Sequence, residues 1–233
     1  MSEHVVVTDI RRADPAVVDA LAEFGSATVH EAMGRIGYVG AHIRPIQQDA
    51  AISGSAITVS AAPGDNLMVH VAIEQAQEGD VIVVVPVTDS AFGFIGELMA
   101  TQMQVRGVRG YVTSGGVRDT AELRSMGFPV WTAHVSAQGT VKDTAGSVNV
   151  PVVLGGAVVA PGDVVVADDD GVTIVPRAIA AETLEAARAR AAREAANRIR
   201  YQDGEISMDL NKLRPVVAEL GIRYVTQAEH DAR

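Results

Sequence analysis

A nearly continuous apolar run from Val81 to Val87 constrains the fold of this chain more than any other feature. Such a run is typical of a strand buried on both faces, as in a parallel sheet covered by helices. Further strands are expected at 52–61, 110–113 and 128–132, and helices at 66–77, 97–106 and 118–126. This alternation predicts an α/β fold with a partly parallel central sheet, whose functional groups gather at the carboxyl ends of the strands.

The pattern changes after Ala133. Short apolar segments separated by Gly, Pro and Asp turns predict a β-rich second half, with strands at 148–153, 157–159, 163–167 and 172–175. A long helix rich in Ala, Arg and Glu is expected from Arg177 to about Tyr201, and a final short helix ends at Gly221. We therefore predict a layered α-β-β-α sandwich in a single domain, 1–233. Its C-terminal helical extension, 177–233, has a thin apolar face and is expected to contact a neighbouring subunit.

Two short helices are expected near the N-terminus. Asp14-Pro15 supplies an N-cap and a first-turn proline, and the apolar face that follows stops at Gly25. The second helix is expected to begin at Thr28, because Thr28-Val29-His30-Glu31 has the form of a capping box.

Composition argues against several classes of function. The net charge of −10 is unsuited to a nucleic-acid-binding surface, which needs clustered Lys and Arg. There is no cysteine, and the six histidines lack the spacing of a zinc hydrolase. The only lysines, Lys142 and Lys212, lie outside the apolar strands, which disfavours Schiff-base chemistry. No membrane span is expected, and Met1-Ser2-Glu3-His4 does not resemble a signal peptide, so we expect a cytoplasmic protein.

The stretch from Gly93 to Asp119 contains two glycine-rich turns that lead into helices, one beginning near Glu97 and one near Arg118. Helix N-termini offer free backbone N–H groups to an anion. The 20 residues between Glu97 and Arg118 suffice for one helix and one strand, so both turns can lie at the same end of the sheet. Two carboxylates and an arginine would then hold a divalent cation together with a carboxylate substrate.

Each of these residues also has a structural interpretation. Asp119-Thr120-Ala121-Glu122 is itself a capping box, and Glu97 in a first helical turn is favourable with the helix dipole. A surface ion pair is the default role of a lone arginine such as Arg118. The run Asp168-Asp169-Asp170-Gly171 lacks the spacing and the terminal glutamate of a calcium loop, so a β-turn is the favoured interpretation.

Several longer motifs extend over nearly the whole chain. They are Gly96-Glu97-Leu98-Met99, Gly116-Val117-Arg118-Asp119, Phe128-Pro129-Val130-Trp131, Pro161-Gly162-Asp163 with the run to Val172, Ala62-Pro63-Gly64-Asp65-Asn66, Gly139-Thr140-Val141-Lys142, and Gly146 to Pro151. Together they are similar to the RraA-like superfamily, and most similar to its metal-dependent (class II) 4-hydroxy-4-methyl-2-oxoglutarate / 4-carboxy-4-hydroxy-2-oxoadipate aldolases. The regulator of ribonuclease E, a binding protein, belongs to the same superfamily.

Two acidic residues separate the aldolases from the regulator in this resemblance. One stands 21 positions before the arginine, where this chain has Glu97 and many members have aspartate. The other lies in the C-terminal helix, where this chain has Glu194. The tail is similar to the oxoadipate members, except that Asp209-Leu210-Asn211 replaces their usual Asp-Met-Tyr.

The resemblance implies retro-aldol cleavage assisted by Mg²⁺ or Mn²⁺. Asp119 would bind the metal directly, while Glu97 and Glu194 of a neighbouring subunit would contact it through water. The resemblance also implies a homotrimer or homohexamer, and a role in aromatic-acid catabolism.

The same resemblance assigns the substrate contacts. Gly96 and the backbone N–H groups of Leu98 and Met99 would bind the substrate carboxylate, and Arg118 would contact the substrate oxygens. The resemblance implies that the substrate is a 2-keto dicarboxylate or tricarboxylate, with oxaloacetate decarboxylation as a side activity. Two alternatives stay open: a non-catalytic ribonuclease regulator of the same fold, and a dedicated keto-acid decarboxylase that uses the same site.

Overall fold

The computed structural model describes residues 4–232, so most of the N-terminal segment considered for a signal peptide lies outside the described residues. The chain forms two compact units, Met1–Arg188 and Ala189–Arg233, and their boundary falls inside the long helix α6 (Ala180–Gln202). Contact between the C-terminal extension and a neighbouring subunit stays a prediction. No helix within residues 4–232 is long and apolar enough to cross a membrane.

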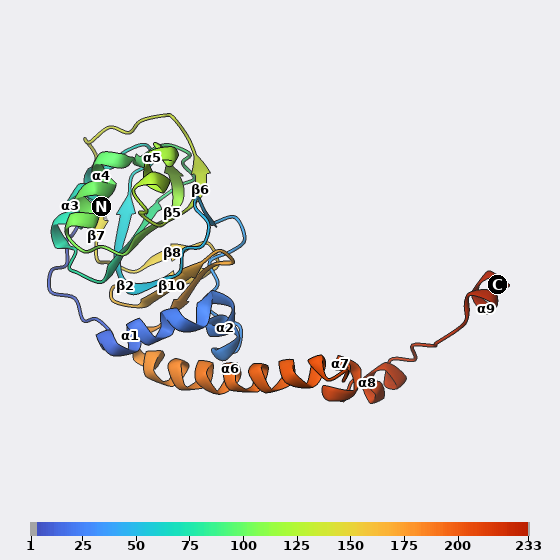
Figure 1. Ribbon diagram of the computed structural model, residues 1–233. Helices are drawn as coiled ribbons and strands as arrows, with labels where there is room; N and C mark the ends of the chain where they lie inside the picture. Colours follow the sequence, from blue (N-terminus) through green and yellow to red (C-terminus); the bar gives the residue numbers. More distant parts are fainter. Residues whose placement is uncertain (1–3, 233) are drawn as a thin grey trace. The chain divides into compact units, whose positions relative to one another are not determined.

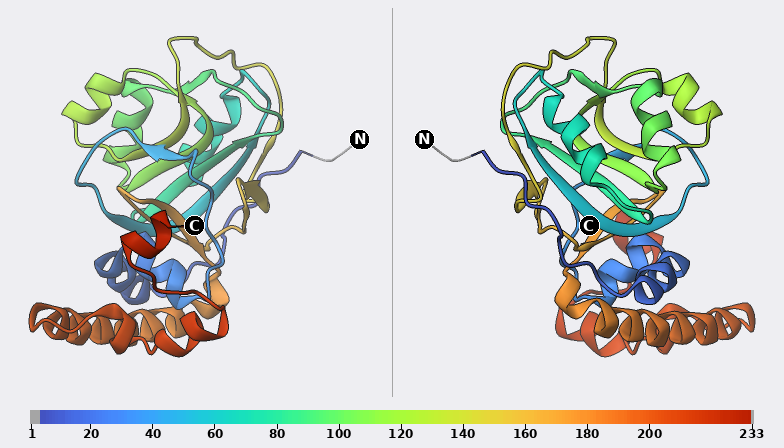
Figure 2. Two further views of the ribbon diagram at one scale, coloured as in Figure 1. Left: turned by 90° about the vertical axis from the view of Figure 1, so that its right-hand side faces the viewer. Right: turned by 90° about the vertical axis from the view of Figure 1, so that its left-hand side faces the viewer.

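A curved nine-stranded sheet forms the centre of the first unit (Figures 1 and 2), with β4 and β7 attached to a seven-strand path in the order β1-β6-β5-β3-β2-β10-β11. The strands are β1 (Arg44–Pro45), β2 (Ile52–Ala61), β3 (Asp80–Pro86), β4 (Gly93–Ile95), β5 (Gly110–Val117), β6 (Val130–Val135), β7 (Ser147–Val148), β10 (Val164–Asp168) and β11 (Gly171–Val175). Strands β2 to β6 pair in parallel, and the other four are attached antiparallel. The predicted α/β class with a partly parallel central sheet and a β-rich second half is therefore confirmed.

Strand β3 is buried on both faces, as its apolar run predicts. Ile82 and Val84 belong to a core shared with α3 (Leu67–Gln75), α4 (Glu97–Val105) and α5 (Thr120–Ser125). Val81 and Val83 belong to a second core under the hairpin of β8 (Val152–Leu154) and β9 (Ala157–Val159). Burying each such side chain stabilises the fold by about 1.5–3 kcal/mol. Helices on one face and a second small sheet on the other therefore hold the parallel strands in place.

A third core lies between β10–β11 and the helices at both ends of the first unit. It joins Val164 and Val175 to α1 (Pro15–Leu21), α2 (Gly25–Ala32) and Leu184 in the first turns of α6. Figure 1 shows α1 and α2 lying beside β10, and the short 3₁₀ turn η2 (Arg177–Ile179) leads from β11 into α6. The predicted long C-terminal helix is confirmed.

The N-terminal helices begin differently from the prediction. Asp14 caps α1 as expected, because its carboxylate accepts a hydrogen bond from the Ala16 N–H at 2.9 Å. The 3₁₀ turn η1 (Ala22–Phe24) then leads directly into α2, so the predicted helix start at Thr28 is wrong. The distant Asp168 serves the N-terminus of α2 instead, since its carboxylate accepts from the Ser26 N–H and hydroxyl at 2.7 and 2.6 Å.

Two further differences concern the end of strand β5 and the number of C-terminal helices. Strand β5 extends to Val117 rather than ending at Thr113, because Gly116 and Val117 pair with both β4 and β6. In the second unit the helices are α7 (Ser207–Leu210), α8 (Arg214–Glu219) and α9 (Gln227–Asp231). The expectation of a last helix ending at Gly221 missed α9, whose capping box is formed by Thr226 and Glu229. The predicted turn at Asp168–Gly171 is confirmed as the link between β10 and β11.

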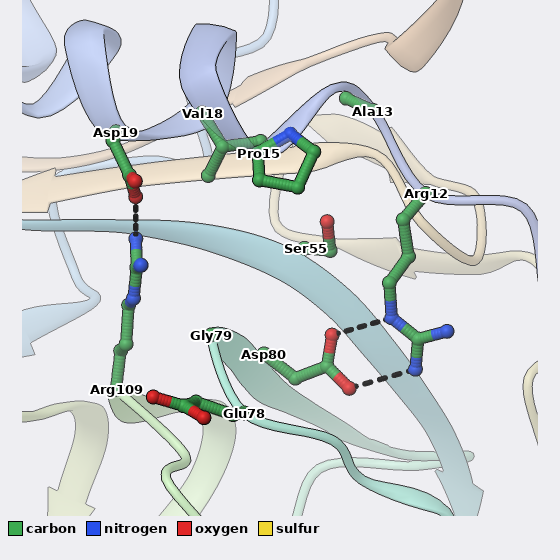
Figure 3. Close-up of a pocket in the computed structure, with 10 residues that line it drawn as sticks. All are labelled: Arg12, Ala13, Pro15, Val18, Asp19, Ser55, Glu78, Gly79, Asp80 and Arg109. Carbon is green, nitrogen blue, oxygen red and sulfur yellow. Dashed lines mark hydrogen bonds and ion pairs between the residues drawn. The ribbon is translucent and has the colours of Figure 1, made fainter.

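A buried ion pair fixes the N-terminal segment to the edge of the sheet where the parallel strands begin. The Asp80 side chain is 1% exposed, and Arg12 donates to both of its oxygens at 2.8 Å. The Gln77 N–H donates to the same carboxylate at 2.8 Å. Figure 3 shows this pair beside a cavity of about 80 Å³, which is also lined by the ion-paired Asp19 and Arg109. The cavity lies at the opposite edge of the sheet from the carboxyl ends of the strands.

Replacing Arg12 by methionine leaves the buried Asp80 carboxylate without its charge partner. The free energy of unfolding of R12M is expected to fall by about 3–5 kcal/mol, measured by urea unfolding. R188A is the control, because Arg188 pairs with Glu185 on an exposed face of α6. Its expected change is below about 1 kcal/mol. Equal urea midpoints for R12M and the unmodified protein would show that the pair does not stabilise the fold.

Candidate functional site

Two strand–helix turns lie side by side at the carboxyl end of the sheet. Strands β4 and β5 are parallel, with Gly93 opposite Gly116 and Ile95 opposite Val117. The N–H of Arg118 donates to the Ile95 carbonyl at 3.0 Å, which ties the second turn to the first. The N-termini of α4 and α5 therefore open onto the same place, which we call the junction (residues 93–97 and 116–119).

The junction brings together three of the residues singled out in the sequence. The N–H of Glu97 donates to Asp119 Oδ2 at 3.1 Å, and Arg118 Nε lies 3.8 Å from the same oxygen. The side chains of Arg118 and Asp119 are 48% and 42% exposed, so both remain open to a ligand. Glu97 is half-buried, and its Oε1 accepts a hydrogen bond from the Thr101 hydroxyl at 3.1 Å.

Asp119 does not cap its own helix, so the capping-box interpretation of its side chain is wrong. Its backbone is left-handed, with φ 54° and ψ 40°, and its carboxylate makes no capping hydrogen bond to α5. Aspartate is one of the few residues that adopt this conformation readily. The side chain turns to the neighbouring helix and accepts from the first N–H of α4. Non-glycine residues in this region are found preferentially at functional sites.

Glycines allow the close approach of Arg118 and Asp119. A Cβ atom on Gly96 would lie 2.1 Å from Asp119 Oδ2 and 3.2 Å from Arg118 Cγ. On Gly93 it would lie 3.1 Å from Arg118 Cβ, and on Gly139 it would lie 3.1 Å from Arg118 Nη1. Gly96 has an extended backbone, with φ −143°, so glycine is needed there for space and not for its dihedral angle. Three glycine positions thus surround the two charged side chains.

The first turn of α4 presents backbone donors at the junction. The N–H of Ala100 bonds to the Gly96 carbonyl, and that of Glu97 bonds to Asp119. The N–H groups of Leu98 and Met99 have no acceptor among the described residues, as expected for the first turn of a helix. The Leu98 side chain is 76% exposed and Met99 is 8% exposed. The two N–H groups are therefore available to an anion.

The donor set fits a hydrated divalent cation. Within residues 4–232 no group of three or more His, Cys, Asp or Glu side chains is placed to hold a metal ion. Mg²⁺ needs no such cage, since it is usually bound by one or two carboxylates, several waters and the substrate. Asp119 Oδ1 accepts no hydrogen bond from the described residues, which leaves one carboxylate oxygen for a metal. Oxygen donors of this kind suit Mg²⁺ or Mn²⁺ better than zinc.

Glu194 belongs to the second compact unit. It lies in α6, where its Oε1 forms an ion pair with Arg190, 2.8 Å from Nε, and its side chain is 45% exposed. Its contribution to the site of a neighbouring subunit stays a prediction.

Asn66, at the N-terminus of α3, is a neighbour of the junction that the search for charged residues missed. Its Nδ2 donates to the Phe94 carbonyl at 2.8 Å and to Met99 Sδ at 3.2 Å, while its Oδ1 is buried and has no partner within residues 4–232. One turn along α3, burial and then the nearby Lys142 lower the pKa of His70, so its ring is uncharged at neutral pH. The only signal in the sequence was the place of Asn66 in the motif that starts at Ala62.

Asp65 holds the segment around Lys142 against this end of α3. It is 2% exposed, and its carboxylate accepts from the N–H groups of Leu67, Asp143 and Thr144 at 2.7–2.8 Å. Burial raises the pKa of Asp65, but these hydrogen bonds outweigh it and hold the pKa below its usual value. An ionised aspartate therefore links a loop to the helix that carries Asn66.

A protein-family model described as RraA-like, Aldolase/RraA, matches residues 16–174. The chain belongs to the RraA-like family. This RraA-like chain is 28% identical over 196 residues to a Halalkalibacterium halodurans protein provisionally named 4-hydroxy-4-methyl-2-oxoglutarate aldolase, covering 83% of this chain and 93% of the relative. A Burkholderia multivorans protein with the same provisional name is 34% identical over 132 residues, 57% of this chain and 80% of the relative.

A solved structure has the same RraA-like fold. It is Streptomyces coelicolor RraAS2, described as an unusual member of the RNase ES inhibitor RraA protein family. The TM-score is 0.74 at 28% identity, and the match covers 82% of this chain and 99% of that one.

Substituting alanine for Gly96 displaces the Asp119 carboxylate, because the new methyl group overlaps Oδ2. G96A is expected to stay folded, by circular dichroism, and to bind Mn²⁺ at least about tenfold more weakly than the unmodified protein, since a ligand is lost. Paramagnetic relaxation of water protons measures that binding. G156A is the matched control, because its Cβ meets only the Tyr38 carbonyl at 3.4 Å. Equal Mn²⁺ affinities for both variants would contradict the role of the close approach.

Substituting asparagine for Asp65 removes a carboxylate that is stabilised in the folded state. A folded-state pKa below the usual 3.8 stabilises the fold fully above that pH, and the contribution is lost as the pH falls through the folded-state pKa. D65N is therefore expected to be less stable than the unmodified protein at pH 7, with a difference that shrinks below about pH 4. Urea unfolding at both pH values measures the difference, and a constant difference would contradict the assignment.

Proposed function

We propose that this chain is a metal-dependent pyruvate aldolase. Its substrates are 4-carboxy-4-hydroxy-2-oxoadipate, cleaved to pyruvate and oxaloacetate, and 4-hydroxy-4-methyl-2-oxoglutarate, cleaved to two molecules of pyruvate. The supporting observation is the junction, where an open carboxylate lies beside an arginine, next to the two free N–H groups in the first turn of α4. The names of the relatives support a lyase of the aldolase kind.

The cation is proposed to be Mg²⁺ or Mn²⁺. Asp119 would hold it directly through the carboxylate oxygen that has no protein donor, and Glu97 would contact it through water. Glu194 of a neighbouring subunit completes the site in the same way, which makes the homotrimer or homohexamer part of the proposal. When bound, the cation stabilises negative charge on the 2-keto oxygen by several kcal/mol.

The protein's own groups position the keto acid. The N–H groups of Leu98 and Met99 bind its C1 carboxylate at the positive end of the α4 dipole. Arg118 donates to the substrate oxygens from a side chain held by Gly93 and Gly139. Charge-assisted hydrogen bonds of this kind are about twice as strong as neutral ones.

The reaction breaks the C3–C4 bond. The C4 hydroxyl gives its proton to a water molecule, a carbonyl forms at C4, and the electron pair of the broken C3–C4 bond passes to C3 as a pyruvate enolate. Water then returns one proton to C3, so the proton count is unchanged. Arg118 faces the oxygen on which this negative charge develops. Lysine is absent from the junction, and the two lysines of the chain are Lys142 and Lys212. Oxaloacetate decarboxylation passes through the same enolate and is expected as a side activity.

Pyruvate release from 4-carboxy-4-hydroxy-2-oxoadipate tests the proposal. Activity is expected with Mg²⁺ and is lost after chelation. D119N and R118A are expected to lower kcat/KM at least about 100-fold, because D119N removes the carboxylate proposed to hold the cation and R118A removes the guanidinium proposed to contact the developing enolate. The circular dichroism of both variants stays unchanged. Activity that survives chelation, or full turnover by D119N, would sink the mechanism.

A ribonuclease regulator is the second candidate, favoured by the similarity to RraAS2. Its acidic surface would bind the enzyme, consistent with the net charge of −10. Retention of a purified ribonuclease on the immobilised chain, with no cleavage of any 2-keto acid, would decide for this candidate.

A further inference from the structure

A separate cleft lies beside α5. It has a volume of about 320 Å³ and opens between α5, β1 and the end of β6. Four nitrogen-rich side chains line it: His42, Arg44, Arg124 and His134. No Asp or Glu lines it within the described part of the chain. The exposed Asp89 carboxylate lies 3.5 Å from His134 Nε2, and Arg44 also lines a second cleft, together with Asp49 and Asp169.

The two arginines of the cleft are not neutralised. Arg124 Nη1 donates to the Ile46 carbonyl at 3.1 Å, and Arg44 Nη1 donates to the Asp170 carbonyl at 3.2 Å. Neither guanidinium has a carboxylate within 4.0 Å among residues 4–232. A guanidinium has five N–H donors, and carbonyl oxygens use only part of them. The cleft therefore holds positive charge and spare donors without an internal anion.

The cleft shares a wall with the junction. Thr120, which lines it, directly follows Asp119, and Arg124 Nη2 lies 3.4 Å from the Thr120 hydroxyl. Val135, also in its lining, pairs with Val117 across β5 and β6. Adjacent Cα atoms are about 3.8 Å apart and neighbouring strands about 4.8 Å apart. The cleft therefore borders the junction through Thr120 and Val135.

The two proposed substrates differ at that far end. At C4 the oxoadipate carries a CH₂–COO⁻ group where the oxoglutarate carries a methyl group. The rest of the two molecules is the same. A site that favours the oxoadipate therefore needs a cationic group placed for one additional carboxylate.

We propose that this cleft binds the additional carboxylate of 4-carboxy-4-hydroxy-2-oxoadipate, with Arg124 as its main contact and Arg44 as the second cation. The inference rests on the proposed aldolase function and deepens it by assigning the residue that sets the choice between the two acids. Arg124 suits the role because its planar guanidinium binds a carboxylate with two parallel hydrogen bonds. It extends from α5, whose N-cap residue Asp119 belongs to the junction.

The ratio of kcat/KM for the oxoadipate to that for the oxoglutarate tests the proposal. In R124Q this ratio is expected to fall about 10- to 100-fold, mostly through KM for the oxoadipate, because one charge-assisted contact is lost. Turnover of the methyl substrate is expected to change less than about twofold. R124K keeps the charge and is expected to recover part of the ratio.

R106Q is the matched control. Arg106 also lies at the end of a helix and donates to backbone carbonyls, those of Glu74 and Ala76, but it is not in the cleft. The ratio of kcat/KM for the two acids in R106Q is expected to equal that of the unmodified protein. Thermal unfolding shows whether R124Q has kept the contact to Ile46.

The two levels of the proposal fail differently. If the unmodified protein cleaves neither acid, the aldolase function is wrong and the inference falls with it. If it cleaves both acids and R124Q keeps the unmodified kcat/KM ratio, the aldolase function stands, but the cleft does not select between the two acids. A ratio that falls equally in R124Q and R106Q would also overturn the assignment.

Discussion

Parallel pairing of strands buried on both faces is the constraint on which the rest of this molecule depends. Parallel strands all end at the same edge, so the helices that follow them begin there too. Strands β4 and β5 are adjacent, and their helices α4 and α5 consequently present two N-termini at one junction. The position of the candidate site is thus set first by the sheet topology and only then by particular side chains.

Crowding at the junction then selects the conformation of the charged groups. The left-handed Asp119 directs its carboxylate to the first N–H of α4, above a position that only glycine can occupy. The result is a carboxylate with one oxygen held and one oxygen open. Such partial engagement orients a ligand and still leaves room for a metal or a substrate, in contrast to Asp65 and Asp168, whose oxygens are used within the fold.

Local sequence patterns predicted where the helices and strands lie better than they predicted which residues contact one another. The apolar run at Val81–Val87 identified β3, and Asp14-Pro15 identified the start of α1. The capping-box patterns at Thr28 and Asp119 were misleading. The distant Asp168 accepts a hydrogen bond at the N-terminus of α2, and the Asp119 side chain accepts one from α4 instead of from its own helix. Asn66 was missed, since an uncharged side chain has no signature until its neighbours are known. Helix capping by residues far apart in sequence is invisible to any window of local sequence.

Helix α6 is one continuous element with two different sources of stability. All of its buried side chains, Ala180, Thr183, Leu184 and Ala187, lie in its first eight residues, before the unit boundary. Amide hydrogens there exchange only when the core opens, whereas those beyond it depend on alanine-rich helix propensity and on whatever packs against them. If the proposed neighbouring subunit packs there, hydrogen exchange in the second half of α6, which contains Glu194, slows on assembly.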